Sequence, residues 1–544
     1  MRRSSCIAIV SLAAFVTALA ASPTQAQCAA PELQKVTAGN LSAYDQFGRA
    51  VAIGSNVAVV GARYADGITA QAGGAYVYRF DGHLWIEEQR LVASDGLPLD
   101  EFGHALAIDG NLIVVGARLG DSPGTPDTGA AYFFRHDGTA WVEEAKVSDG
   151  VAGGEFGYAV DLQGDVALVG ARLDDGPVTG SGAAYVYRNL AGSWTLEQKL
   201  LASDGDTLDC FGAATALDGN LAVVGAYLET NTVNAGGAVY VYRYDGTNWI
   251  QERKLLASDR APDDRLGISV DVDGDWVIAG AYRADKTSSL DCDSGAAYIF
   301  HYAGGSWSED QKLTASDGQC GHCFGLSVGL SGSLAVVGSF LYEFWVEDRG
   351  AAYAFRYNGT DWLEELKLLA SDGDTGDLFG TSVAVSGETV MIGAFTDDCK
   401  AIDTGSAYLY QGPAWTRYGT GTPGTNGITP TIRAVGCPTL GNHLFDVIGE
   451  NALPRSWGTL LVGFKPLWSI AAGWELLVDM RGPPPGVVVH VGFSAGGSCT
   501  VDMPIPNNPY LDGLGLYLQF LIEDPGAANG VASTAGLKMS MYKD

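Results

Sequence analysis

A unit of about 55 residues recurs seven times between Phe47 and Tyr410, and this repetition constrains the fold more than any other feature. Each copy opens with Phe-Gly or Leu-Gly, at Phe47, Phe102, Phe156, Phe211, Leu266, Phe324 and Phe379. Fourteen residues later comes a glycine followed by Ala or Ser, at Gly61, Gly116, Gly170, Gly225, Gly280, Gly338 and Gly393. Six copies then place a Trp nine residues after the first Tyr of an aromatic strand, at Trp85, Trp141, Trp194, Trp249, Trp307 and Trp362. A fixed period of this size indicates a solenoid or a propeller.

The hydrophobic pattern inside one copy predicts four short antiparallel strands. In the second copy these are the alternating segment His104–Asp109, the apolar run Leu112–Val115, the aromatic segment Ala130–Arg135 and the alternating segment Trp141–Val147. A four-stranded sheet repeated radially is a propeller blade, and the lack of helical periodicity disfavours helical solenoids.

The two ends of the repeat region are complementary, which predicts a closed ring. The last copy stops at Trp415 without the charged strand that follows Trp in the other copies, and Glu32–Val36 supplies a strand of that kind. Lys35 lies twelve residues before Phe47, as Lys199 lies twelve before Phe211. We therefore expect an all-β fold, a seven-bladed propeller over residues 27–415 whose seventh blade is completed by the strand 32–36. A parallel β-solenoid is the competing architecture, but it would not need complementary ends.

The repeated Phe-Gly and Gly-Ala motifs resemble the FG-GAP repeats of integrin α-chain propellers and their bacterial relatives, over roughly residues 30–415. Integrin blades carry an Asp-x-Asp-x-Asp-Gly calcium loop between their first two strands. The corresponding turns here are tight, as at Asp109-Gly110-Asn111, and supply too few oxygen ligands for calcium. The chain is therefore most similar to the variant of these repeats without the calcium loop, found in secreted bacterial proteins.

The regions outside the repeats predict an exported protein with a second domain. Residues 1–26 have the Arg pair, apolar run and small-residue cleavage site of a secretory signal. Residues 416–430 are rich in Gly, Thr and Pro and are expected to be a linker, and residues 431–544 are expected to form a small β-sandwich-like domain. The end of that domain resembles a tail module of secreted bacterial proteins. No apolar stretch after the signal is long enough to span a bilayer.

The net charge and the cysteine content indicate in which compartment the protein occurs and which kinds of partner it can bind. The formal net charge of −31 repels nucleic acid and anionic lipid, and favours solubility or cationic ligands. Removal of the signal leaves eight cysteines, an even number that is compatible with disulfides in a secreted, periplasmic or cell-surface protein. For Cys320 and Cys323 we expect a structural disulfide, and Cys437 and Cys499 are candidates for another. A monomer is expected.

Because successive strands of a blade run in opposite directions, the loops between second and third strands lie on the same face of the disc as the links between blades. These loops are longer and acidic, and we call this face the loop face. Variable loops on a rigid scaffold are the usual place for binding, so we predict that this face meets a ligand. Two sets of residues on this face are candidate sites, one for a ligand and one for a cation. The candidate ligand-binding residues are Phe344, Trp345, Asp348, Asp397 and Asp398.

Paired aspartates in the links between blades allow two interpretations. The pairs are Asp95 and Asp100, Asp204 and Asp209, and Asp372 and Asp377. In the structural interpretation, the first aspartate of each pair accepts backbone N–H groups of its own turn and the second braces the next strand. In the alternative, the pairs bind Ca²⁺ weakly, and no other cofactor is expected.

The residues predict a binding protein rather than an enzyme. Gly492–Gly496 has the spacing of a nucleophile elbow, but no histidine follows His490 and no helix is expected there. We therefore expect an exported, non-enzymatic binding or adhesion module with a protein or glycan partner. An extracellular polymer-degrading enzyme and a structural cell-envelope protein are the alternatives.

Overall fold

The structure is a computed structural model in which the propeller region is described almost throughout. The described residues are 28–29, 32–122, 124–176, 178–231, 233–284, 293–340, 349–411, 415–418, 425, 429–435, 446–450, 452, 454–463, 466–471, 474–478, 487–494, 498–502, 515–525, 527, 531–534 and 536–540. The expected signal segment, residues 1–26, lies outside these ranges.

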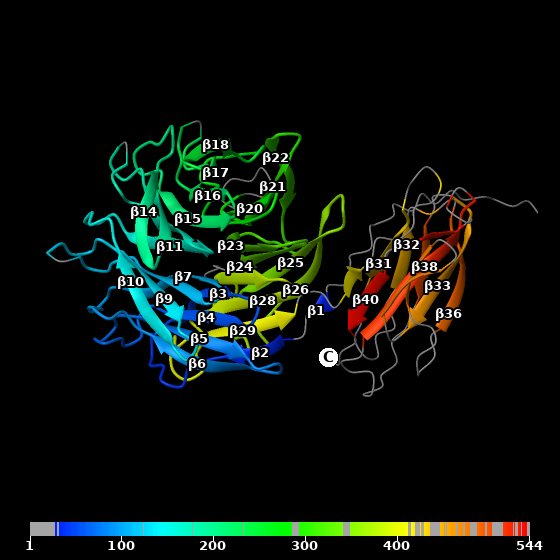
Figure 1. Cartoon of the computed structure of the whole chain (residues 1–544), viewed down its shortest axis with the longest axis horizontal. Coiled ribbons are helices and arrows are strands. Elements are labelled where there is room, and N and C mark those ends of the chain that lie inside the picture. The colour runs from blue at the N-terminus through cyan, green and yellow to red at the C-terminus, as the bar shows by residue number, and fades with distance from the viewer. Residues whose placement is uncertain are drawn as a thin grey trace, which may run out of the picture.

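Each of the seven copies forms one antiparallel sheet, and the sheets are arranged radially as the blades of a propeller (Figure 1). The first strands are β3 (Phe47–Ile53), β7 (Phe102–Asp109), β11 (Phe156–Gln163), β15 (Phe211–Asp218), β19 (Val270–Asp273), β23 (Phe324–Ser331) and β27 (Ser382–Ser386). The second strands are β4 (Val57–Ala62), β8 (Leu112–Ala117), β12 (Val166–Ala171), β16 (Leu221–Ala226), β20 (Trp276–Ala281), β24 (Leu334–Ser339) and β28 (Thr389–Ala394). The third strands are β5 (Gly74–Phe80), β9 (Ala130–His136), β13 (Ala183–Leu190), β17 (Ala238–Tyr244), β21 (Ala296–Ala303), β25 (Ala351–Tyr357) and β29 (Ser406–Gln411). The fourth strands are β6 (Trp85–Leu91), β10 (Trp141–Val147), β14 (Ser193–Leu200), β18 (Trp249–Leu255), β22 (Ser306–Leu313), β26 (Trp362–Leu368) and β2 (Glu32–Val36).

The ring closes through the N-terminal strand, as the complementary ends of the repeat indicated. β2 pairs antiparallel with β29, with Lys35 opposite Tyr408. Gln34 of β2 then holds the first blade, because its side-chain amide donates to the carbonyl of Trp85 and accepts from the Trp85 N–H, both at 2.8 Å. The first strands contact one another around the axis, and the contact between β27 and β3 completes the circle.

The two glycines that define the repeat lie where neighbouring blades approach most closely. The Gly of each Phe-Gly pair has a positive φ, as at Gly103 (φ 91) and Gly212 (φ 91). A Cβ at Gly61, the Gly-Ala glycine of the first blade, would overlap the carbonyl oxygen of Gly103 in the second blade. The same overlap recurs at every boundary between neighbouring blades, which we call a seam. A side chain at either glycine position would therefore push two blades apart.

The apolar core lies between blades rather than inside one. One buried cluster joins Val57, Val59 and Val77 of the first blade to Ile113 and Val115 of the second. The Phe of each Phe-Gly pair packs edge-on against a strand-three Tyr, with ring centroids 5.4 Å apart for Phe211 and Tyr240. Because each blade shares its core with both neighbours, no blade buries its apolar surface alone.

A short strand outside the repeat adds to the sixth blade. β1 (Cys28–Ala29) pairs parallel with β26, which makes the sixth sheet five-stranded. This pairing was not expected from the sequence. It places the first described residues beside the sixth blade, one blade away from the strand that closes the ring.

The C-terminal region is also all-β and contains three sheets among its described residues. A six-stranded sheet contains β30 (Trp415–Tyr418), β33 (Trp457–Gly463), β36 (Val487–Gly492), β38 (Gly515–Glu523), β39 (Val531–Ser533) and β40 (Gly536–Ser540). A three-stranded sheet contains β31 (Thr431–Val435), β32 (Asp446–Glu450) and β37 (Cys499–Asp502), and a two-stranded one contains β34 (Pro466–Ala471) and β35 (Trp474–Val478). Trp415, which we placed at the end of the propeller, pairs with β40 of the C-terminal sheet instead. In the described part of the chain, no helix is long and apolar enough to cross a membrane.

The close approach of the glycines predicts a large, position-specific effect of a methyl group. Gly212→Ala places a Cβ against the carbonyl oxygen of Ala183 and also forces Ala into a positive φ, so we expect a loss of about 3 kcal/mol or more. Gly219→Ala is the matched control, because Gly219 also has a positive φ but nothing lies within 4 Å of the added Cβ. We expect about 1 kcal/mol there, from the backbone alone. Urea unfolding of the two variants measures the difference, and equal losses would contradict this account.

Candidate functional site

The structure separates the residues proposed for ligand binding. Phe344, Trp345 and Asp348 lie outside the described residues. Asp397 is only 4% exposed, and its carboxylate binds Lys35 Nζ at 2.7 Å and the Tyr408 hydroxyl at 2.5 Å. It therefore holds the ring-closing strand and is not presented to solvent. Asp398 is exposed and accepts the N–H of Asp403 within its own loop.

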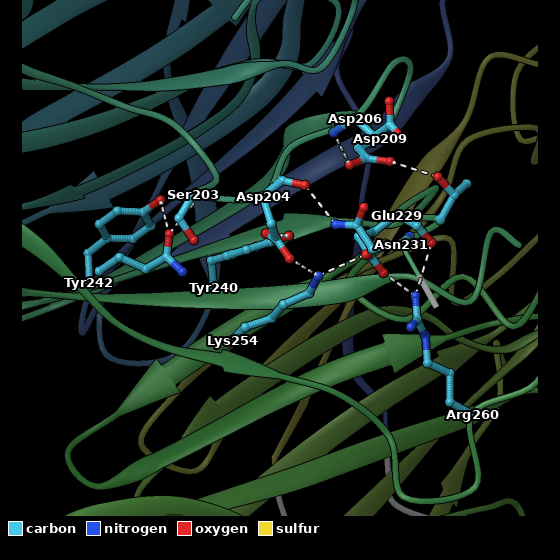
Figure 2. Close-up of polar contacts among 12 residues, drawn as sticks. Ser203, Asp204, Asp206, Asp209, Glu229, Asn231, Tyr240, Tyr242, Lys254 and Arg260 are labelled. Atoms are coloured by element: carbon cyan, nitrogen blue, oxygen red, sulfur yellow. Dashed lines mark hydrogen bonds and ion pairs between the residues drawn. The ribbon is translucent and has the colours of Figure 1, made fainter. Parts of the chain in front are cut away.

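The first aspartate of each link connects two blades. Asp204 accepts a hydrogen bond from the Tyr240 hydroxyl at 2.8 Å and pairs with Lys254 Nζ at 2.6 Å, and both partners belong to the same neighbouring sheet (Figure 2). Asp95, Asp259, Asp317 and Asp372 each bind a Tyr and a Lys in the same way. These contacts lower the pKa of the Asp204 carboxyl against the opposing effect of burial. We call this repeated unit the Asp–Tyr–Lys contact.

The second aspartate of each link holds its own turn. The Asp209 carboxylate accepts the backbone N–H of Asp206 at 2.7 Å, and Asp100 and Asp377 accept N–H groups of Leu97 and Asp374. The roles are therefore the reverse of those we assigned from the sequence, where the first aspartate was to hold the turn. Burial raises the pKa of Asp100 and of Asp377 to about 6. The described residues contain no group of three or more His, Cys, Asp or Glu side chains that could hold a metal ion.

Three blades carry an additional buried acid at the same repeat position. Glu229, which is fully buried, pairs with Lys254 Nζ at 2.8 Å and with the Arg260 guanidinium, so Lys254 joins two carboxylates (Figure 2). Asp174 and Asp397 occupy the same repeat position in the third and seventh blades and pair with Lys199 and Lys35. Each of the three acids pairs with a lysine on the fourth strand of its own blade, which indicates that they stabilise the blades and do not bind ligand.

A different group of charges lies around the axis, at the loop-face ends of the first two strands in blades one to three. We call it the axial cluster, and its members are Arg49, Arg63, Glu101, His104, Arg118, Glu155, Tyr158 and Arg172. Arg63, Arg118 and Arg172 directly follow the Gly-Ala motif, and Glu101 and Glu155 directly precede Phe-Gly. Because the first strands of neighbouring blades contact one another, these positions meet across the seams.

The carboxylates and guanidiniums of the axial cluster alternate along a chain of ion pairs. Arg118 binds Glu101 through two nitrogens, at 2.8 and 2.9 Å, and reaches Glu155 at 3.0 Å. Arg172 binds the other oxygen of Glu155 at 2.5 Å and lies over the Tyr158 ring, 4.0 Å from its centroid. Glu101 is 3% exposed, and hydrogen bonds from His104 and Arg118 lower its pKa strongly although burial alone would raise it.

His104 is neutral in this setting. Burial lowers its pKa to about 3, despite its contact with Glu101, and repulsion by Arg49 and Arg118 acts in the same direction. Its ring also packs against Tyr158, with centroids 5.0 Å apart. The axial cluster therefore holds its positive charge on arginine side chains alone at neutral pH.

The opposite end of the first strands is acidic. Asp161 of β11 and Asp271 of β19 each accept two backbone N–H groups, one from their own strand and one from the next blade. Burial raises the pKa of each to about 7, and neighbouring carboxylates such as Asp109 and Asp218 add to the rise. The first strands are thus basic near the loop face and acidic near the tight turns that join them to the second strands.

Neither the Cys320–Cys323 segment nor the Gly492–Gly496 segment gains support as a catalytic centre. Cys320 is disulfide-bonded as expected, but Cys323 carries a free thiol that is 7% exposed, so the two cysteines do not bridge each other. Burial raises the pKa of this thiol to about 12, the opposite of the shift that activates a nucleophilic cysteine. Ser494 hydrogen-bonds with the Ser498 hydroxyl, 3.0 Å away.

The axial cluster was not predicted from the sequence, although a signal was present. Aligned copies place Arg after Gly-Ala in blades one to three, but Tyr227 and Tyr282 in blades four and five. Glu101 and Glu155 are likewise replaced by Cys210 and Arg265. A comparison of each repeat position around the ring, rather than along the chain, would have shown that one side of the axis differs from the other.

Comparison with known proteins identifies the repeats. The family described as FG-GAP repeat matches seven segments, residues 31–78, 85–134, 141–187, 194–242, 249–300, 307–355 and 362–410. Together these segments cover more than half of the chain, and each runs from the fourth strand of one blade through the third strand of the next. No curated protein matches the chain.

Two half-buried aspartates with raised pKa values predict that the protein is more stable in mild acid than in mild base. Asp161 and Asp271 stay protonated in the folded state up to about pH 7 but ionise near pH 4 when unfolded, so the folded state binds more protons in between. Their contribution is complete below about pH 4 and is lost as the pH rises to about 7. We expect a higher Tm at pH 5 than at pH 8. Asp161→Asn with Asp271→Asn should flatten this dependence, and an unchanged slope would contradict the assignment.

The Asp–Tyr–Lys contacts predict that calcium does not stabilise the propeller. Asp95, Asp204 and Asp372 each already face a lysine ammonium, which occupies the position that a cation would take. We expect no change in Tm when millimolar Ca²⁺ replaces Mg²⁺ at constant ionic strength. A shift that Asp204→Asn abolishes would establish the calcium interpretation instead.

Proposed function

The chain belongs to the FG-GAP repeat family, and we propose that it is an exported, non-enzymatic binding module whose loop face contacts a partner outside the cell. An FG-GAP propeller is a fold often involved in binding. The proposed export rests on the signal-like residues 1–26. The partner proposed is a protein or a glycan, and the exposed side chains described next favour a protein.

Exposed apolar side chains at the tips of the loop face carry this proposal. Tyr44, Leu99 and Leu208 lie in links between blades and are 54%, 52% and 54% exposed. Each has a positive φ, between 63° and 71°, which a bulky side chain adopts only at a cost in free energy. Neither burial nor packing explains why large apolar residues occupy these strained, solvent-exposed positions. A partner that covers them would.

Loop tips of the preceding blades extend the same surface. Ile402, Ile68 and Val178 are 56%, 55% and 38% exposed and lie in loops between second and third strands. The N–H of Tyr44 donates to the carbonyl of Ile402 at 2.9 Å, so a link tip and a loop tip are fixed together. We call these six residues the apolar rim. Aliphatic side chains on rigid backbone are typical of protein-binding surfaces, whereas glycan sites rely mainly on aromatic faces and hydrogen bonds.

The two alternatives predict different behaviour. A polymer-degrading enzyme needs a general acid and a general base, or a nucleophile. The carboxylates of the axial cluster that could take these roles, Glu101 and Glu155, are held in ion pairs with Arg118 and Arg172. A structural envelope protein needs no exposed surface of this kind. The apolar rim therefore favours a binding module over both.

Substitution of the apolar rim tests the proposal. The variant Tyr44→Asn, Leu99→Asn, Leu208→Asn removes apolar surface and relieves strain, because Asn tolerates a positive φ. In a screen of the mature chain against immobilised extracellular proteins and glycans, we expect it to weaken binding by about tenfold or more, with Tm unchanged or higher.

The matched control removes equally exposed residues elsewhere. Ile86→Asn with Ile250→Asn alters side chains that are each 52% exposed on the fourth strands β6 and β18. This variant should bind as the wild type does. Equal loss in both variants would contradict a specific loop-face site, and release of soluble fragments from a polymer in the screen would favour the enzyme.

A further inference from the structure

Arg49 differs from every other arginine of the axial cluster. It lies on the first strand β3, is half-buried, and its guanidinium lies 5.8 Å from the centroid of the Phe395 ring. Arg63 pairs with Gln46 and Glu101, and Arg118 and Arg172 pair with Glu101 and Glu155. Among the described residues, no carboxylate forms an ion pair with Arg49.

The axial cluster therefore contains more positive than negative charge. Its four guanidiniums face two carboxylates, and His104 is neutral because burial lowers its pKa to about 3. Burial also lowers the pKa of Arg49, and repulsion from Arg63 and Arg118 acts in the same direction, whereas Tyr158 and Glu101 oppose the shift. A half-buried guanidinium without an ion-pair partner is less stable than one that an anion joins.

We propose that the axial cluster binds one carboxylate of a partner protein, an Asp or Glu side chain that Arg49 meets at the centre of the loop face. This inference rests on the proposed function, since the apolar rim supplies the surrounding contact. The planar guanidinium matches a carboxylate through two parallel hydrogen bonds. The proposed site lies at the ends of the inner strands, where the contacts among blades one to three hold the arginines in place.

The charge distribution limits the ligand to a single carboxylate. The loops between second and third strands carry exposed acids such as Asp127, Asp175 and Asp398, and the chain as a whole has a net charge of −31. This field repels polyanions such as acidic polysaccharides or nucleic acid. A lone acidic side chain on an otherwise apolar or basic surface meets little repulsion and finds the one unpaired cation of the cluster.

The opposite polarity of the two ends supports the same assignment. Asp161 and Asp271 lie near the turns between first and second strands, at the other end of the inner strands from the arginines of the axial cluster. A ligand carboxylate would then supply the compensating anion for Arg49.

A short peptide with one carboxylate tests the site. The probe is acetyl-Gly-Asp-Gly-amide, with the Asn peptide as its neutral match, titrated against the mature chain by saturation-transfer NMR. We expect binding of the Asp peptide only, weakened by added salt. Arg49→Gln should raise Kd by about tenfold or more, and Arg49→Lys, which keeps the charge but loses the fork, by less. Arg79→Gln is the control, because Arg79 pairs with Glu88 on the outer strands and its loss changes the net charge equally.

Stability provides a second readout. Without peptide, Arg49→Gln should melt at the same temperature as the wild type or higher, because it removes an unpaired charge beside Arg63 and Arg118. A marked fall in Tm would show that Arg49 serves the fold and would overturn the proposal. Equal binding of the Asn peptide, unchanged Kd in Arg49→Gln, or tighter binding of glucuronate or sulfate than of the Asp peptide would also overturn it.

The two proposals can fail separately. Loss of partner binding in the apolar-rim variant but not in Arg49→Gln would leave the binding module standing and remove the axial site. Loss in Arg49→Gln alone would support the axial site and remove the rim from the interface.

Discussion

The propeller depends on the contact between two backbones at each seam. The Gly-Ala glycine of one blade faces the Phe-Gly glycine of the next so closely that no side chain fits at either position, as Gly61 and Gly103 illustrate. This approach lets the first strands form a continuous inner ring and brings valines of adjacent blades into one core. The conserved spacing within each copy is thus a requirement of packing. Every other repeated feature, including the Asp–Tyr–Lys contacts, can form only once this approach is made.

Much of the fold could be predicted because the same local pattern is repeated seven times. Four short strands per copy, one sheet per copy and the role of Glu32–Val36 in the last sheet follow from periodicity and from the complementary ends. The additional strand Cys28–Ala29 could not be predicted, since two residues carry no periodicity and their pairing with β26 depends on where the chain runs after closing the ring. Trp415 matched the repeat in residue type, but its strand pairs with the C-terminal sheet.

The candidate site was harder to predict, for a physical reason. Sequence reasoning could place acidic residues on one face but could not tell which of them has a cation beside it. Asp397 is buried against Lys35, a residue more than 360 positions away in the chain, and Asp204 binds the next blade through Tyr240 and Lys254. The axial cluster joins Glu101 to Arg118 of its own blade and to Arg63 of the preceding blade. Such pairs become visible only when the blades are arranged around the axis.

Symmetry separates the parts of this protein that serve stability from the parts available for binding. Contacts that recur at five or more seams, such as the Asp–Tyr–Lys contacts and the glycine approach, are needed for the ring and cannot distinguish one ligand from another. The axial cluster is confined to blades one to three, and the strained apolar tips Tyr44, Leu99 and Leu208 occupy three links only. A ring with seven equivalent positions has no need for such differences, and both sets of departures place their cost in free energy on the same face. Because a propeller holds these departures on a rigid frame, a partner that buries the tips and supplies the missing carboxylate would recover that cost on binding.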